Sequence, residues 1–226
     1  GCQAEAVRVP AADFNAARIP EGVTAEQALM LTDALATAWF GARNADITHG
    51  ATVAVVGLGP IGLMAAEGAL VMGAGRVFGI DLVEDRRAMG RAIGLETPDP
   101  AEAREYIREA THGRMCDSVI EAVGHSATIR AALGLAGRRG TVSVIGVNQD
   151  RAMEFPMSKA FAMGLNFRIG TCSVPQEWPE LVPLIQSGRL KPERYISHTL
   201  DLSEGARAYD LFNRRVEGVM KMVLDI

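Results

Sequence analysis

From residue 52 the chain reads Thr52-Val53-Ala54-Val55-Val56-Gly57-Leu58-Gly59-Pro60-Ile61-Gly62, an apolar run followed at once by closely spaced glycines. A continuous apolar run of this length is typical of a strand that is buried on both faces, as in a parallel sheet. Residues 60–72, rich in Ala, Leu and Met, are typical of a helix. The sequence therefore predicts a buried strand, a glycine turn and a helix, in that order.

The glycines follow the spacing G-x-G-x-x-G, and each would serve a different purpose. Gly57 would make the tight turn, Gly59 would let the backbone approach a pyrophosphate, and Gly62 would let the helix pack closely on the strand. The helix N-terminus, with Pro60 near its first position and Ile61 after it, would offer the free N–H groups of its first turn to the phosphates. The strand-turn-helix context supports a dinucleotide site. The alternative is a glycine turn that binds nothing.

An acidic residue stands where such a site needs one. Asp81 follows Gly62 by 19 residues and ends a second apolar run, residues 76–80. A carboxylate there accepts hydrogen bonds from the adenosine ribose and repels a 2′-phosphate. The next residues are Leu82 and Val83, with no basic residue directly after Asp81. We predict NAD rather than NADP. The alternative is that Asp81 only caps the following helix.

Beyond this unit, apolar runs and amphipathic stretches continue to alternate. Further strands are expected at 116–122, 141–145 and 166–171, and helices at 84–93, 101–111, 126–136 and 158–163. This order predicts an α/β fold with a doubly wound parallel sheet and helices on both faces. The flanks differ: we expect a strand at 5–9, a helix after 173, another from 203, and a closing strand at 220–224.

Composition excludes several classes of protein. The net charge is −4 with both signs mixed along the chain, which is unlike the basic stripe of a nucleic-acid binder. No apolar run approaches the length of about 18 residues that a membrane span needs. The three cysteines are far apart, which disfavours a disulfide framework and favours a reducing cytoplasm. Cys116 and Cys172 are predicted to be buried thiols.

Five segments together resemble the zinc-dependent alcohol dehydrogenases of the medium-chain dehydrogenase/reductase superfamily. They are residues 4–10 (AEAVRVP), 31–39 (LTDALATAW), the glycine loop, 120–124 (IEAVG) and 140–147 (GTVSVIGV). The resemblance covers essentially the whole chain. It implies an oxidoreductase that transfers a hydride between NAD and an alcohol, aldehyde or ketone, with zinc in the intact enzyme. It also implies a homo-oligomer, a dimer or a tetramer.

The resemblance assigns roles to residues near the nicotinamide. Asp33 matches the third protein ligand of the catalytic zinc, and an oxygen donor suits that metal. The alternative is that Asp33 caps the helix that follows it. Thr37 lies one helical turn later on the same face, at a position that in the family is beside the nicotinamide.

Other matches concern the rest of the cofactor. Arg86 matches a basic residue near the adenosine ribose, and Lys221 one near the pyrophosphate. Val123, Gly146 and Val147 match strand ends that line the cofactor cleft, as expected for the carboxyl edge of an open sheet. For Val123 and Val147, ordinary core packing remains the alternative.

One departure from the family is large. A full member begins with a GroES-like catalytic domain that holds a Cys and a His zinc ligand, and most of that domain has no match here. We therefore expect residues 1–30 to be the end of the catalytic domain, 31–172 the NAD-binding Rossmann domain, and 173–226 a segment returning to the catalytic domain. Such a truncated chain is expected to be inactive alone. Two alternatives are a zinc-free quinone reductase of the same superfamily and a non-catalytic nucleotide-binding module.

Overall fold

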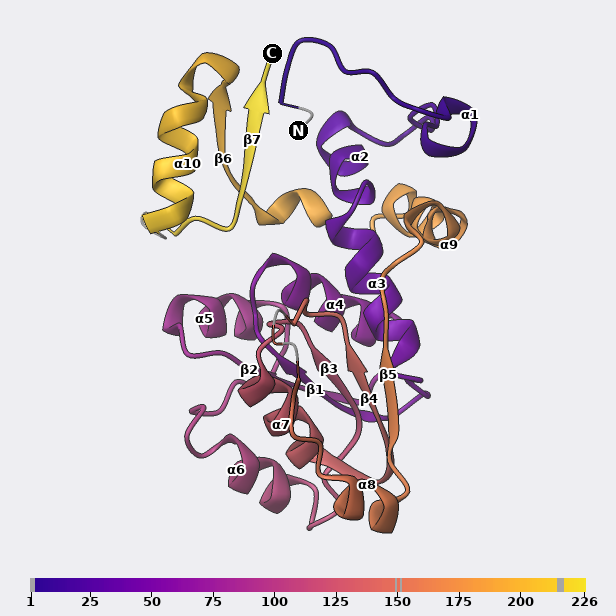
Figure 1. The fold of residues 1–226 in the computed structure, drawn as a ribbon, viewed down its shortest axis with the longest axis vertical. Coiled ribbons are helices and arrows are strands. Elements are labelled where there is room, and N and C mark those ends of the chain that lie inside the picture. The colour runs from indigo at the N-terminus through magenta and orange to yellow at the C-terminus, as the bar shows by residue number, and fades with distance from the viewer. Residues whose placement is uncertain (1–2, 149, 151, 215–217) are drawn as a thin grey trace.

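The computed structural model describes residues 3–148, 150, 152–214 and 218–226. Its centre is an all-parallel sheet with the strand order β2-β1-β3-β4-β5 (Figure 1). The strands are β1 (Thr52–Val56), β2 (Arg76–Ile80), β3 (Cys116–Glu121), β4 (Ala136–Val144) and β5 (Asn166–Ile169). Because β2 and β3 lie on opposite sides of β1, the strand order reverses there. The crevice at the carboxyl ends of β1 and β3 is the usual ligand site of such a sheet.

Helices cover both faces of this sheet. They are α3 (Ala34–Asn44), α4 (Pro60–Val71), α5 (Glu84–Ala92), α6 (Ala103–Ala110), α7 (Ser126–Leu135) and α8 (Met157–Met163). Alternate residues of β1 belong to different cores: Val53 and Val55 pack with α3 and α4, whereas Ala54 and Val56 pack with residues of α6 and α7. This is the period of two that a strand buried on both faces requires. The predicted doubly wound Rossmann sheet is confirmed.

The two ends of the chain come together beside the sheet (Figure 1). They contain α1 (Ala12–Asn15), α2 (Ala25–Leu31), α9 (Val174–Gln186), β6 (Ile196–Asp201), α10 (Gly205–Arg214), β7 (Lys221–Asp225) and the 3-10 turns Pro192–Tyr195 and Leu202–Glu204. β6 and β7 pair in parallel as a separate two-stranded sheet. Trp39 on α3 donates a 2.8 Å hydrogen bond to Glu180 on α9, and the Tyr195 hydroxyl donates one of 2.8 Å to Glu67 on α4. The terminal segments therefore share a core with the helices of the sheet.

The sequence-based expectations fail mainly in these terminal segments. The strand expected at 5–9 is wrong: these residues are exposed, none of them pairs with a strand in the described structure, and a short helix follows at Ala12–Asn15. β6 was not predicted. The closing strand exists as Lys221–Asp225, and one of its edges is paired with β6. In the central sheet, β4 begins at Ala136, five residues before its expected start.

Candidate functional site

The glycine loop after β1 has room for a ligand at one position and none at another. Gly59 has φ −66°, a value open to any residue, and an added Cβ would meet no atom within 4 Å. At Gly62 an added Cβ would lie 1.8 Å from the Gly57 carbonyl oxygen. The first amide bonded within α4 is that of Leu63, which donates to the Gly59 carbonyl oxygen. The amides of Ile61 and Gly62 precede it, as needed for an anion site at a helix N-terminus.

Asp81 holds the glycine loop from the end of β2. Its carboxylate accepts a 2.8 Å hydrogen bond from the Leu58 amide and another from the Val83 amide, and it lies 3.6 Å from the Arg86 guanidinium. Val83 directly precedes α5, so the bond from its amide resembles the helix cap that is the alternative role of Asp81. The bond to Leu58 was not predicted. Each carboxylate oxygen has a second lone pair, so these contacts leave Asp81 able to accept further hydrogen bonds.

The loops after β3 and β4 lie against each other at the same edge. An added Cβ on Gly146 would be 2.1 Å from the Gly124 amide nitrogen. Val123 is 41% exposed and Val147 is 78% exposed, which contradicts the alternative that they are core residues. Both are therefore available to a ligand above the carboxyl ends of the strands.

Small-molecule sites usually enclose about 300 to 1,000 Å³, and a cavity in this range lies at this edge. There, a cavity of about 510 Å³ is lined by five of the residues predicted for the site, Asp33, Thr37, Ile61, Gly146 and Val147. It continues along β5 to Thr171 and Cys172. The structure thus brings together residues that are separated by more than a hundred positions in the sequence.

Asp33 and Thr37 interact at the mouth of this cavity. The Thr37 hydroxyl donates a 3.0 Å hydrogen bond to the Asp33 carboxylate. Asp33 directly precedes α3, yet its side chain makes no capping bond to that helix, contrary to the alternative interpretation. Within the described part of the chain, no three His, Cys, Asp or Glu side chains form a metal-binding group. The described residues alone therefore do not fit a zinc ion, because Asp33, which is exposed, offers only one of the ligands that the metal needs.

Two basic residues border the other side of the α4 N-terminus. Arg86 and Lys221 line a cavity of about 280 Å³ together with Pro60 and Ile61. Since Ile61 also lines the larger cavity, the two cavities are neighbours at the first turn of α4. The predicted cofactor residues near the adenosine ribose and the pyrophosphate are therefore neighbours in space.

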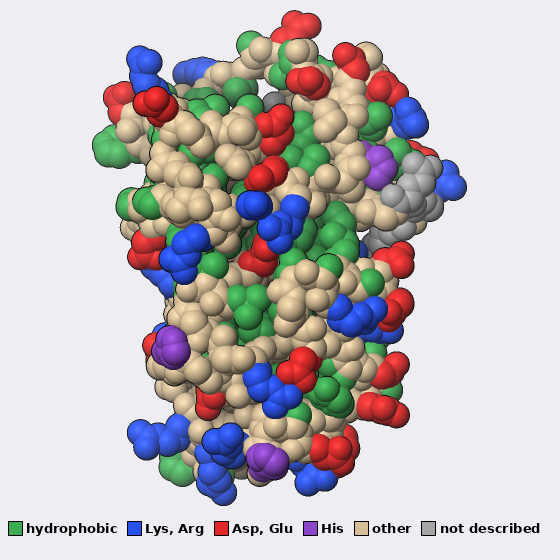
Figure 2. All heavy atoms as spheres, turned by 180° about the vertical axis from the view of Figure 1, so that it is seen from behind, with side chains coloured by type: hydrophobic (Ala, Val, Ile, Leu, Met, Phe, Trp, Pro, Cys, Tyr) green, Lys and Arg blue, Asp and Glu red, His purple; other side chains and the backbone are tan. Residues whose placement is uncertain are grey.

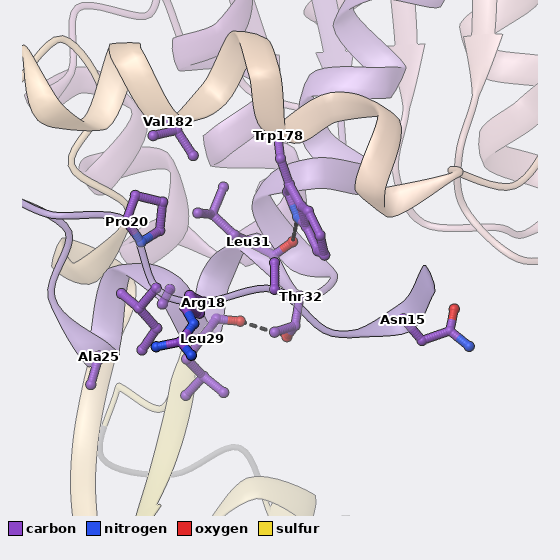
Figure 3. A pocket seen from close by; sticks show the side chains of 12 residues that line it. Asn15, Arg18, Pro20, Ala25, Leu29, Leu31, Thr32, Trp178 and Val182 are labelled. Carbon is purple, nitrogen blue, oxygen red and sulfur yellow. Dashed lines mark hydrogen bonds between the residues drawn. The ribbon is translucent and has the colours of Figure 1, made fainter. Parts of the chain in front are cut away.

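A third cavity, of about 360 Å³, contains none of the predicted site residues. It lies between residues 15–20, α2 and α9 and has mainly apolar walls (Figure 3). The Trp178 indole closes one side and donates a 3.0 Å hydrogen bond to the Leu31 carbonyl oxygen.

On the rear face of the molecule, positive and negative side chains are mixed (Figure 2). Of the helices described, none has the length and apolar character needed to span a bilayer.

Cys172 differs from its expected environment. It is half-buried and lines the cavity of about 510 Å³, whereas Cys116 is completely buried as predicted. Burial raises the pKa of the Cys172 thiol to about 11, with smaller contributions from the negative charges of Glu177 and Asp33. Burial also raises the pKa of the Cys116 thiol to about 12.

These differences predict a pH-dependent labelling pattern. In a Cys2→Ser background, iodoacetamide should modify Cys172 slowly at pH 7, with the rate rising about tenfold per pH unit towards pH 10, because the thiolate is the reactive form. Cys116 should stay unmodified until the protein is unfolded, which serves as the internal control. Peptide mass spectrometry would follow both sites. Rapid labelling of Cys172 at pH 7 would contradict the environment described here.

Comparisons with known proteins identify the family of this chain. The family model described as "Zinc-binding dehydrogenase" matches residues 60–187. A "Probable zinc-binding alcohol dehydrogenase" of Mycobacterium tuberculosis is 46% identical over 92% of this chain and 54% of its own length. An alcohol dehydrogenase of Cupriavidus necator is 37% identical over 99% of this chain and 63% of its own length.

A solved structure gives the same result for the fold. The alcohol dehydrogenase TADH from Thermus sp. ATN1 superposes with a TM-score of 0.95 at 36% identity, over 100% of this chain and 66% of that chain. The chain thus spans between about half and two thirds of the length of these relatives.

Proposed function

Because this chain belongs to the zinc-binding dehydrogenase family, we propose that it binds NAD(H) across the carboxyl edge of its sheet. In this proposal it forms the cofactor-binding part of an oxidoreductase that acts on an alcohol, aldehyde or ketone. The observation that carries it is the cavity of about 510 Å³ that joins the α4 N-terminus to Asp33, Thr37, Gly146 and Val147. The nicotinamide supplies hydride transfer when it is bound.

Each part of the chain has its own task in binding. The Ile61 and Gly62 amides donate to the pyrophosphate, which Gly59 admits because it has no side chain. Lys221 adds positive charge near these phosphates, and Arg86, beside Asp81, adds it near the adenosine ribose. Val123 and Val147 present apolar surface to the nicotinamide side of the cleft.

The proposal also gives roles to Asp33 and Thr37, at the end of the site where the nicotinamide would react. Asp33 would be one zinc ligand, and the remaining ligands would come from residues outside the set described here. The Thr37 hydroxyl, which donates to Asp33, would fix the orientation of that carboxylate.

We also propose self-association through β5, whose outer edge is unpaired within the described chain. A single monomeric species in sedimentation velocity would overturn that part.

Calorimetric titration with NAD and NADP tests the cofactor assignment. NAD should bind at least about tenfold more tightly, because the Asp81 carboxylate repels a 2′-phosphate. Asp81→Asn should reduce this ratio, since it removes the charge and keeps an acceptor oxygen. Asp81→Ala is a poorer test because it also frees the buried Leu58 amide, to which the carboxylate is bonded.

The matched control is Asp85→Asn, which removes an exposed charge from the first turn of α5. This variant should keep the ratio of the parent protein. Equal affinities for NAD and NADP in the parent would contradict the role of Asp81. Absence of binding to both would contradict the proposed function itself.

A further inference from the structure

Glu121 is a completely buried carboxylate at the centre of the sheet. It is the last residue of β3, with Val56 of β1 on one side and Val144 of β4 on the other, and its exposed fraction is 0%. No ion pair joins it to a cation of the described chain. A buried carboxylate is costly unless hydrogen bonds compensate for its lost hydration. Its position therefore calls for an explanation that apolar packing does not give.

The hydrogen bonds to the Glu121 side chain come from the loop that follows it and from the first turn of α7. One carboxylate oxygen accepts hydrogen bonds from the Val123 amide at 3.0 Å, the Gly124 amide at 2.9 Å and the Thr128 hydroxyl at 2.7 Å. The second oxygen lies 3.2 Å from the Gly124 amide. All of these groups are donors, and a carboxylate is an acceptor-only group when ionised. The side chain thus fixes the turn from β3 into α7.

The main chain of Glu121 holds the neighbouring loop. Its carbonyl oxygen accepts from the Ile145 amide at 2.9 Å and from the Gly146 amide at 3.1 Å. One residue therefore connects the loop after β3, through its side chain, with the loop after β4, through its backbone. These are the loops that bring Val123 and Val147 to the proposed nicotinamide side.

The loops are packed too closely to move independently. An added Cβ on Gly57 would lie 2.4 Å from a methyl carbon of Val123, and one on Gly124 would lie 2.5 Å from the Val147 carbonyl oxygen. A displacement of Val123 and Gly124 is therefore transmitted to the first glycine of the dinucleotide loop on one side and to Val147 on the other. Tightly packed interiors transmit such strain because they contain few voids.

Resting on the proposed function, we propose that Glu121 is a positioning residue for the nicotinamide half of the cofactor site. It does not contact the cofactor, since it is wholly buried. It acts through the Val123–Gly124 turn, whose amides it binds. The adenosine half is built around Asp81 at the end of β2, whose carboxylate binds the Leu58 and Val83 amides and not the amides of this turn.

Binding of NADH and of AMP by the 226-residue chain separates the two halves. Glu121→Gln should weaken NADH binding about tenfold, because one oxygen is replaced by a donor that faces the Gly124 amide. AMP, which occupies only the adenosine half, should bind within about twofold of the parent. Fluorescence titration gives the first affinity and calorimetry the second. Both are measured well below the unfolding midpoint of the variant, so that loss of folded protein does not enter.

Glu96→Gln is the matched control, because it makes the same change in a carboxylate that binds Arg76 at the opposite end of β2. It should leave both affinities unchanged. If Glu121→Gln does not fold, Thr128→Val removes a single donor, with Thr128→Ser as its conservative counterpart. Thr128→Val should weaken NADH binding two- to threefold and spare AMP, and Thr128→Ser should restore it.

The outcomes are distinguishable. Unchanged NADH affinity in the folded Glu121→Gln variant, or in Thr128→Val when the first does not fold, overturns the inference alone. An equal loss of NADH and AMP binding also overturns it, because a general structural defect would act on both halves. If the parent chain binds neither NADH nor AMP, the proposed function fails instead.

Discussion

Gly59→Val should abolish measurable NADH binding, a loss of at least about 100-fold, while the free protein stays folded. The reason is that the space beside Gly59 is open in the protein alone and would be filled only by the pyrophosphate. The backbone there has φ −66°, so valine introduces no strain of the left-handed kind. NADH fluorescence titration together with a thermal unfolding curve would test both halves of the expectation.

Gly62→Val is the contrasting variant. A Cβ at position 62 would lie only 1.8 Å from the Gly57 carbonyl oxygen, so the backbone would have to shift. The unfolding temperature should therefore fall markedly. Substitution at position 59 should therefore lower the NADH affinity without lowering the unfolding temperature, and substitution at position 62 should lower both. Retained NADH affinity in a folded Gly59→Val variant would show that the glycine loop is not the pyrophosphate site.

Asp33→Ala should eliminate zinc binding and alcohol turnover in a protein that carries the whole zinc site. A suitable protein joins this chain to the third of the Thermus relative that the superposition does not cover. There, loss of one of three protein ligands should lower both zinc content and turnover by at least about 100-fold. NADH affinity should change by less than about twofold, since the dinucleotide loop and Asp81 carry most of the contacts. Atomic absorption and NADH production measure the two effects.

Asp13→Ala, in the exposed helix α1, controls for the loss of a carboxylate elsewhere. It should keep full zinc and full rate. If Asp33→Ala behaves in the same way, Asp33 is not a ligand, and the zinc-free reductase discussed above becomes the better description. If the joined protein of the parent sequence holds zinc but has no activity, the proposed reaction is wrong while the ligand assignment stands.

The sequence predicted the central sheet well because its signals are local. β1 and β2 are short apolar runs that end at glycine or aspartate, and both were placed correctly to the residue. β4 was not, because its first residues, Ala136-Gly137-Arg138-Arg139, carry no strand pattern. Within this segment Ala136 pairs with Cys116 of β3, and a register shift separates that pair from the next one, Thr141 with Ser118. Such pairing is a property of the folded chain and leaves no trace in a single segment.

The terminal segments were harder for the same reason. Residues 5–9 have the composition of a strand, yet a strand needs a partner, and here they are exposed without one in the described structure. β6 has a partner in β7, more than twenty positions away, and this pairing stabilises a segment in which half-buried and exposed residues alternate.

The candidate site shows a similar division. The sequence predicted Asp33, Thr37, Gly146 and Val147 as site residues, and the fold brings them to one cavity. It did not indicate that Asp81 binds the Leu58 amide, or that Glu121 binds the turn behind Val123. Both contacts join a carboxylate to a backbone amide, a group that every residue except proline has and that no sequence pattern marks.

The glycines of this edge would be preserved by two different evolutionary pressures. Gly62 and Gly146 are held by their own neighbours, so any descendant that still folds must keep them. Gly59 faces open space, and under the proposed function only the cofactor would forbid a side chain there. A lineage that kept this fold but gave up its dinucleotide would lose selection on position 59 first, while the other two stayed fixed. Substitution at position 59 alone would therefore mark the descendants in which the ancestral chemistry had been abandoned.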